Sequence, residues 1–108
     1  MIRHCVWWTL KDHAEGNSAE GNARIMKEKL ESLRGLSSLK DMEVALSFPP
    51  TTTEEVHILL FTTHDDIAGM RTYRTEPEHL EVVDFIKKVV SSRKCIDWEV
   101  QPHQGERS

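Results

Sequence analysis

The chain has 108 residues, of which 30% are charged, with a net charge of −4 and a mean hydropathy of −0.51. This length suits a single small domain, and the apolar runs are too short to cross a bilayer. Acidic and basic residues are interspersed without a basic stripe, so no nucleic acid partner is expected. Because no signal-peptide pattern opens the chain, we expect a cytoplasmic protein whose cysteines, Cys5 and Cys95, stay reduced.

The first predicted element is a strand from Ile2 to Leu10. Successive side chains of a strand point to opposite faces, so His4 and Trp8 share one face while Cys5 and Trp7 share the other. Both faces are largely apolar. We expect one of Trp7 and Trp8 to pack beneath the helices and the other to lie in a dimer interface.

A helix is predicted after a polar loop over residues 11–17. Asn17 or Ser18 is suited to cap its start, and Gly35 to end it. The expected buried stripe follows the three-and-four spacing of a helix face and consists of Ala19, Ala23, Met26, Leu30 and Leu33.

Two strands are predicted next, from Leu39 to Phe48 and from Val56 to Thr63, on either side of a proline-rich turn. Asp65 or Asp66 then caps a short helix that contains Tyr73.

The next helix begins near Pro77, where Thr75 and Glu78 have the spacing of a capping box. His79 stands at the head of its apolar stripe, which continues through Val82, Val83, Ile86, Val89 and Val90. A titratable ring in this position either has an internal hydrogen-bond partner or takes part in chemistry.

A last strand is predicted from Lys94 to Val100, which completes the order β-α-β-β-α-β. This order favours an α+β, ferredoxin-like fold, a four-stranded antiparallel sheet with both helices on one face. The strands that begin at Ile2 and Val56 would be central. We expect one domain over residues 1–101 and a polar tail over 102–108.

The uncovered face of that sheet indicates a partner. In the third strand His57, Leu59 and Phe61 point away from Val56, Ile58 and Leu60, and both faces are mostly apolar. Only one face can be covered by the chain's own helices, and an exposed apolar patch is typical of an interface. We therefore expect a homodimer through the sheet face. The alternative is a monomer that tolerates a few exposed apolar side chains.

Several short motifs resemble the stress-responsive A/B barrel family of dimeric α+β barrels. They are the opening Met1-Ile2-Arg3-His4, the R-G-L-S-S-L-K-D-M-E-V segment over 34–44, Tyr73 with Pro77-Glu78-His79, and the closing D-W-E-V over 97–100. The family commonly has a histidine immediately before that proline, where this chain has Glu76. The resemblance implies the ferredoxin-like fold and a dimer, but it fixes no single function.

One relative in this family, the plant polyketide cyclase olivetolic acid cyclase, performs an aldol condensation with a tyrosine and histidines between sheet and helices. The resemblance places His4, His57, Tyr73 and His79 at the matching positions, as candidate catalytic residues.

The residues themselves allow three functions. If His4 and His57 share the helix-covered face, their rings would meet His79 in one pocket with Tyr73 at its mouth. In the first function, the protein is a dimer that binds a small molecule in this pocket and has no assigned chemistry. In the second, it is a cofactor-independent cyclase or enolising lyase that acts on a β-keto or polyketide-like substrate. In the second case His79 is the base and Tyr73 the oxyanion donor. In the third, these side chains only support a structural stress protein.

No cofactor or metal is expected, because no histidine, cysteine or carboxylate has metal-ligand spacing in the sequence. A ligand site would need a cavity of roughly 300 Å³ or more beside His79 and Tyr73. If instead the cavity is filled by Trp8, Leu59 and Phe61, and a backbone carbonyl holds His79, the structural function is favoured.

Overall fold

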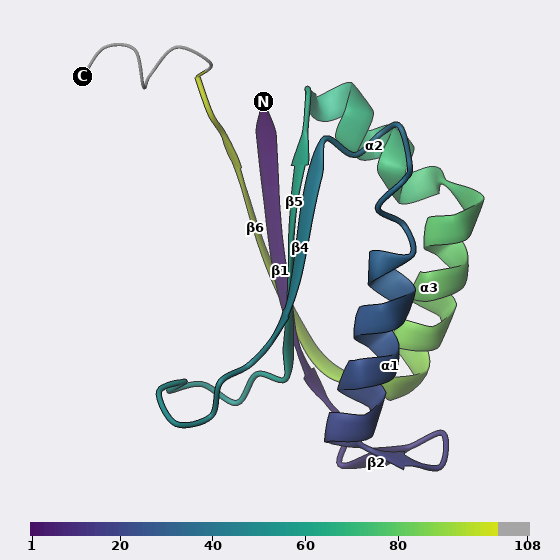
Figure 1. Cartoon of the computed structure of the whole chain (residues 1–108), viewed down its shortest axis with the longest axis vertical. Helices are drawn as coiled ribbons and strands as arrows, with labels where there is room; N and C mark the ends of the chain where they lie inside the picture. Colours follow the sequence, from purple (N-terminus) through teal and green to yellow (C-terminus); the bar gives the residue numbers. More distant parts are fainter. Residues whose placement is uncertain (102–108) are drawn as a thin grey trace.

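The computed structural model describes residues 1–101, and the predicted tail over 102–108 lies outside the described residues. One antiparallel sheet contains β1 (Ile2–Leu10), β4 (Asp41–Leu46), β5 (Ile58–His64) and β6 (Val90–Glu99) in the spatial order β4-β5-β1-β6. Three helices, α1 (Ala19–Glu31), α2 (Ile67–Thr75) and α3 (Pro77–Val89), cover one face of it (Figure 1). This is the predicted ferredoxin-like α+β fold, with β1 and β5 central.

The register of the central strands decides which side chains face the helices. His4 lies opposite Thr62 on β5 and opposite Asp97 on β6. Because side chains alternate along strands, His4 shares its face with Trp8, and this face packs under the helices. Trp8 is only 4% exposed, so it is the tryptophan that packs beneath the helices.

Local chemistry sets the starts of the helices. Ser18 and Asp66 accept from the backbone N–H groups of Gly21 and Gly69, so one of the two residues predicted for each cap is confirmed. The capping box predicted around Pro77 is wrong. Glu76 is the N-cap of α3 without a side-chain cap bond, and the Thr75 hydroxyl donates within α2 to the Thr72 carbonyl.

The bounds of three predicted strands shift, and a predicted loop contains a hairpin. The last strand, β6, begins at Val90 and not at Lys94, so Val90 does not belong to the helix stripe. The second long strand, β4, is shorter than the predicted Leu39–Phe48, and β5 begins two residues after Val56. The polar loop after β1 forms a hairpin from β2 (His13–Ala14) and β3 (Asn17–Ser18). Its turn residues, Glu15 and Gly16, both have positive φ, which a tight two-residue hairpin requires.

The core lies between the sheet and the helices. α1 and α3 contribute its helical side, including Met26, Leu30 and Val89, and the sheet contributes Val6, Trp8, Ile58 and Leu60. Burial of such side chains is the dominant favourable term in folding, so this layer fixes the positions of the polar groups set within it.

The other face of the sheet carries no helix within residues 1–101, and the loop over 47–57 projects on that side (Figure 1). Phe61 stacks on Trp98 with ring centroids 5.8 Å apart, and Ile96 is 54% exposed. Cys5, Trp7 and Leu59 on the same face are half-buried. The predicted apolar sheet face is therefore present.

Candidate functional site

A cavity of about 110 Å³ lies between the helix-covered face of the sheet and the helices. Leu30, Val83 and Ile86 belong to its apolar wall. Its polar lining comes from four different elements and consists of His4, Trp8, Tyr73, Arg74, His79 and Arg93. The fold thus brings together three of the four predicted site residues, His4, Tyr73 and His79.

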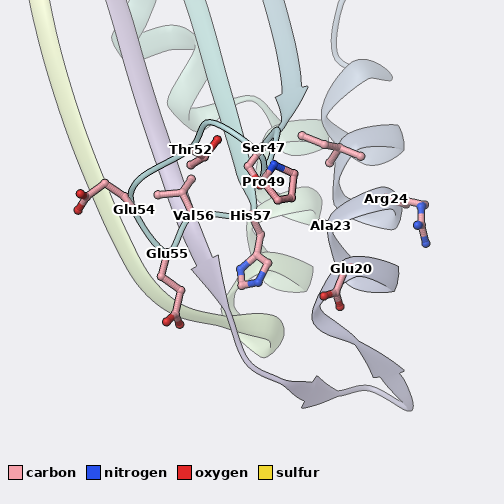
Figure 2. A pocket seen from close by; sticks show the side chains of 11 residues that line it. Glu20, Ala23, Arg24, Ser47, Pro49, Thr52, Glu54, Glu55, Val56 and His57 are labelled. Carbon is pink, nitrogen blue, oxygen red and sulfur yellow. The ribbon is translucent and has the colours of Figure 1, made fainter.

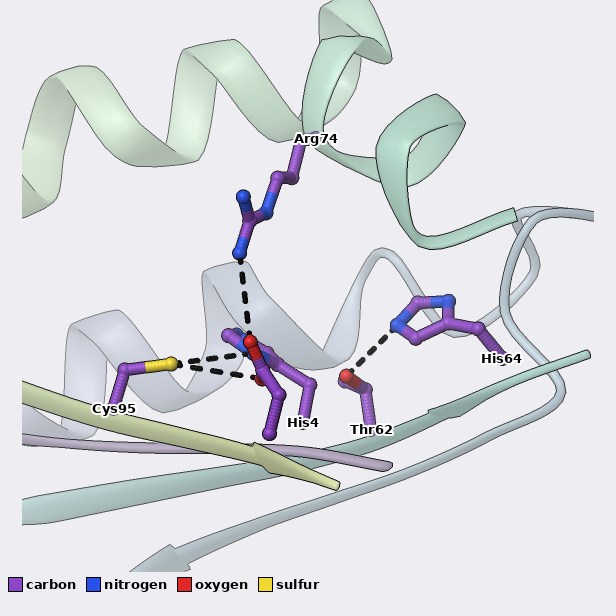
Figure 3. Close-up of polar contacts among 6 residues, drawn as sticks. His4, Thr62, His64, Arg74 and Cys95 are labelled. Atoms are coloured by element: carbon purple, nitrogen blue, oxygen red, sulfur yellow. Dashed lines mark hydrogen bonds and ion pairs between the residues drawn. The ribbon is translucent and has the colours of Figure 1, made fainter. Parts of the chain in front are cut away.

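His4 forms the strongest polar contact of the site. Its Nδ1 lies 2.5 Å from Asp97 Oδ1, directly across the β1–β6 pairing, and Cys95 Sγ lies 3.5 Å from the same nitrogen (Figure 3). A carboxylate accepts, so Nδ1 of a neutral ring carries the proton and Nε2 keeps a lone pair. Burial lowers the pKa of His4 despite the opposing effect of Asp97, which keeps the ring neutral near pH 7.

His79 is held in a similar tautomer. Its Nδ1 lies 3.2 Å from the backbone carbonyl of Arg74, which only accepts, so Nδ1 donates and Nε2 is free of its proton. Burial lowers the pKa of His79 as well, and the charges of His4, Arg74 and Arg93 act in the same direction. The arrangement leaves an unprotonated ring nitrogen on a residue that lines the cavity.

Tyr73 was predicted to lie at the mouth of a pocket, but it lies deep in the core. It is 2% exposed, its ring centroid is 4.5 Å from that of His79, and burial strongly raises the pKa of its hydroxyl. No atom of residues 1–101 hydrogen-bonds this hydroxyl or the indole N–H of Trp8. Buried polar groups without partners are uncommon, and here two of them line one cavity.

The prediction that His57 joins this pocket is wrong. The register pairs Trp8 with Ile58, so His57 falls at the far end of the sheet, level with Thr9, five residues along β1 from His4, or about 17 Å. Its Nδ1 accepts the backbone N–H of Leu10 at 2.9 Å. It lines a separate groove of about 380 Å³ between the 47–57 loop and α1, near Glu20 (Figure 2).

Glu76, which the resemblance sets against a histidine of the family, is the N-cap residue of α3. Its carboxylate accepts a long hydrogen bond of 3.4 Å from the Ser38 hydroxyl, and it does not line the cavity.

Sequence reasoning missed four groups around His4: Asp97, Cys95, Arg74 and Arg93. All three β6 residues share the parity of Asp97, so an explicit β1–β6 register was the signal that could have found them. The ligand atoms of His4, Cys95 and Asp97 lie within 4.8 Å of one another, close enough for a metal ion. However, a guanidinium nitrogen of Arg74 lies 3.9 Å from Asp97 Oδ2, and its positive charge opposes a cation there (Figure 3).

A four-stranded antiparallel sheet with helices on one face defines the class of ferredoxin-like α+β domains. The family model of the stress responsive A/B barrel domain, Dabb, matches residues 2–100. The chain therefore belongs to this family, as the sequence motifs predicted.

Solved structures from bacteria show the same fold. A dimeric ferredoxin-like protein of unknown function from Bacteroides fragilis is 26% identical, over 92% of this chain and 95% of that one, with a TM-score of 0.78. A Dabb family protein from Mesorhizobium loti is 25% identical over 93% and 96%, with a TM-score of 0.65. A dimeric ferredoxin-like protein from Thermobifida fusca is 16% identical over 92% and 90%, with a TM-score of 0.78.

No curated protein matches the chain at a significant level. In the part of the chain that the structure describes, no helix is both long and apolar enough to span a membrane.

Proposed function

We propose that this protein is a homodimeric small-molecule-binding domain whose ligand occupies the cavity between sheet and helices. The carrying observation is the pair of buried, unpartnered donors, the Tyr73 hydroxyl and the Trp8 indole N–H, on the wall of one cavity. Leaving such a donor unpaired costs roughly 1–3 kcal/mol, which a ligand oxygen would recover.

The size of the cavity limits that ligand. At about 110 Å³ it is smaller than the roughly 300 Å³ expected from the sequence. Leu59 and Phe61 lie on the opposite face of the sheet and do not fill it, although His79 is held by a backbone carbonyl. The geometry supports a compact ligand in place of a long polyketide chain.

Titration of the protein with 2,4-pentanedione, followed by the indole N–H signals in NMR spectra, tests this binding site. The three tryptophans provide an internal comparison, since Trp8 lines the cavity while Trp7 and Trp98 lie on the open sheet face. We expect the Trp8 signal to shift and saturate while the other two stay unchanged. If neither this diketone nor its carboxylate analogue moves the Trp8 signal at millimolar concentration, the binding function is refuted.

The dimer is proposed through the open sheet face. Its support is the apolar surface around Ile96 and Trp98, together with the dimeric B. fragilis relative. Such a patch is costly to expose, and two sheets packed face to face at about 10 Å would cover it.

Sedimentation velocity of Ile96→Glu tests that interface, because the substitution buries a carboxylate if the faces meet. Leu80→Glu is the matched control, since Leu80 is 49% exposed on α3 and Ile96 is 54% exposed on β6. We expect the first variant to be monomeric at micromolar concentration and the second to remain dimeric. A wild type that sediments as a monomer would contradict the proposal.

A second function, enolisation of a small ketone, is supported by the tautomer of His79. Its Nε2 would take an α-proton, the C–H electron pair would form the new C=C bond, and the carbonyl oxygen would receive the displaced π pair. The Tyr73 hydroxyl, whose ring lies beside that of His79, would donate to this enolate oxygen. Return of the proton from His79 to carbon or oxygen completes the cycle without a cofactor.

Exchange of acetone protons in D₂O, followed by NMR, tests this second function. General base catalysis contributes about 10²–10⁴-fold, so His79→Gln should lose about 100-fold or more of any acceleration. His57→Gln is the matched control, because His57 was predicted to be catalytic and lies outside the cavity. Exchange that is no faster than in buffer would leave the protein a binding domain.

A further inference from the structure

The polar wall of the cavity is rich in hydrogen-bond donors. Tryptophan and arginine side chains only donate, and the Tyr73 hydroxyl has no acceptor within residues 1–101. Trp8 and Tyr73 provide donors in the buried part of the wall, and Arg74 and Arg93 provide exposed ones. A ligand that matches this wall must therefore present acceptor oxygens at two depths.

The charge around the cavity is positive, which favours the same kind of ligand as the donors do. His4 and His79 are neutral near pH 7, because burial lowers the pKa of each ring. Asp97 is the one carboxylate in contact with the described site, and it is shared between His4 and Arg74. No carboxylate of residues 1–101 pairs with Arg93, so its positive charge is not neutralised.

We propose that the cavity selects a short keto acid, with its carboxylate at the exposed guanidinium groups of Arg93 and Arg74 and its keto oxygen at Tyr73 and Trp8. This rests on the proposed binding function and adds the chemical class of its ligand. Arginine is suited to this role because its planar fork of N–H groups matches a carboxylate. The partly exposed position keeps the cost of desolvating the anion small.

A cation is the competing occupant, because the ligand atoms of His4, Cys95 and Asp97 are clustered. The same two arginines oppose it, since the repulsion between unit charges at short range exceeds 1 kcal/mol at a protein surface. The charge of the site thus favours an anion.

Acetoacetate and 2,4-pentanedione form a matched pair of probes for this inference. They have the same number of non-hydrogen atoms, and acetoacetate has a carboxylate where 2,4-pentanedione has an acetyl group. Charge-assisted hydrogen bonds contribute about 1.5–3 kcal/mol, so acetoacetate should bind at least about tenfold more tightly at low salt. Added salt should weaken the binding of acetoacetate and leave that of the diketone unchanged.

Arg93→Gln identifies the group responsible, and Arg24→Gln is its control because Arg24 lies on α1 and lines the separate groove near His57. We expect Arg93→Gln to lower the affinity for acetoacetate about tenfold and leave that for the diketone unchanged, while Arg24→Gln changes neither.

The outcomes separate this inference from the function on which it rests. If both probes bind equally, the keto acid class is wrong and the small-molecule site stands. If neither probe binds, the proposed function itself fails. A preference for acetoacetate that survives both Arg93→Gln and Arg74→Gln overturns the assignment of its carboxylate to these arginines.

Discussion

Two buried histidines on the helix-covered face of the sheet, His64 and His4, show that burial does not by itself make a histidine part of a ligand site. His64, at the end of β5, is fully buried, and both of its ring nitrogens are bonded. Nδ1 lies 2.8 Å from the Ser38 carbonyl. Nε2 lies 3.0 Å from the Thr62 hydroxyl (Figure 3). His4 is 6% exposed, but its one bonded nitrogen faces the carboxylate of Asp97, and no hydrogen bond to its Nε2 forms within residues 1–101.

The difference lies in the partners. The neutral partners of His64 use its full hydrogen-bonding capacity, so the ring has no group left for a ligand. The partner of His4 fixes its tautomer and leaves the other nitrogen unbonded on a residue that lines the cavity. Tyr73 packs between these environments, with ring centroids 5.2 Å from His64 and 4.5 Å from His79.

The largest effect on stability is expected from His64→Ala. This change removes a fully buried ring and leaves both the Ser38 carbonyl and the Thr62 hydroxyl without a partner, at a cost of about 3 kcal/mol. His4→Ala should cost about 1 kcal/mol, because Asp97 stays partly exposed and next to Arg74. Urea unfolding measures both values. Equal losses would show that the two histidines have the same structural role.

Two isosteric substitutions test the same contrast between bonded and unbonded buried groups, with smaller expected changes in stability. Thr62→Val leaves Nε2 of His64 unpaired and should cost about 1–2 kcal/mol. Tyr73→Phe removes a buried hydroxyl that has no partner within residues 1–101, so it should be neutral or stabilise the ligand-free protein by up to about 1 kcal/mol. It should also weaken 2,4-pentanedione binding. A loss of stability in Tyr73→Phe would mean that this hydroxyl is satisfied in solution.

The fold was predictable because its signals are local and agree with one another. Alternation in β1, the three-and-four spacing in α1 and α3, and the capping residues Ser18 and Asp66 together specify the element order and the helix-covered face. Alternation in β1 also predicted correctly that Trp7 and Trp8 lie on opposite faces of the sheet, of which Trp8 is the buried one.

The site was predictable only in part, because it depends on register and on non-local contacts. The His4–Asp97 pair joins residues 93 positions apart, and it requires the β1–β6 register as well as the order of strands. His57 failed for a related reason, since its residue type matched the family position but its place along the strand separates it from His4. The burial of His64 was not predicted, because it involves non-local contacts with the Ser38 carbonyl and the ring of Tyr73.

The pH dependence of stability tests whether the rings of His4 and His79 are buried in their neutral form. Burial lowers the pKa of His4 and of His79 below the ordinary value, so near and below pH 6.5 the unfolded chain binds protons more readily than the folded one. Stability should therefore fall as the pH drops from about 7.5 to about 5.5. The groups that face His4 are Asp97, Cys95 and Arg93 on β6, Arg74 on α2 and His79 on α3.

The lowered pKa of His4 already includes the opposing effect of Asp97, because the pKa is lowered despite the carboxylate beside the ring. Burial alone would raise the pKa of Asp97, but the hydrogen bond and charge of His4 lower it, so any loss from Asp97 comes only below pH 3.8. Unfolding in urea at both pH values should show a smaller loss for His4→Gln and His79→Gln than for the wild type. His13→Gln, on the exposed hairpin, should keep the full loss, and an unchanged loss in all three variants would show that neither ring is buried as a neutral group.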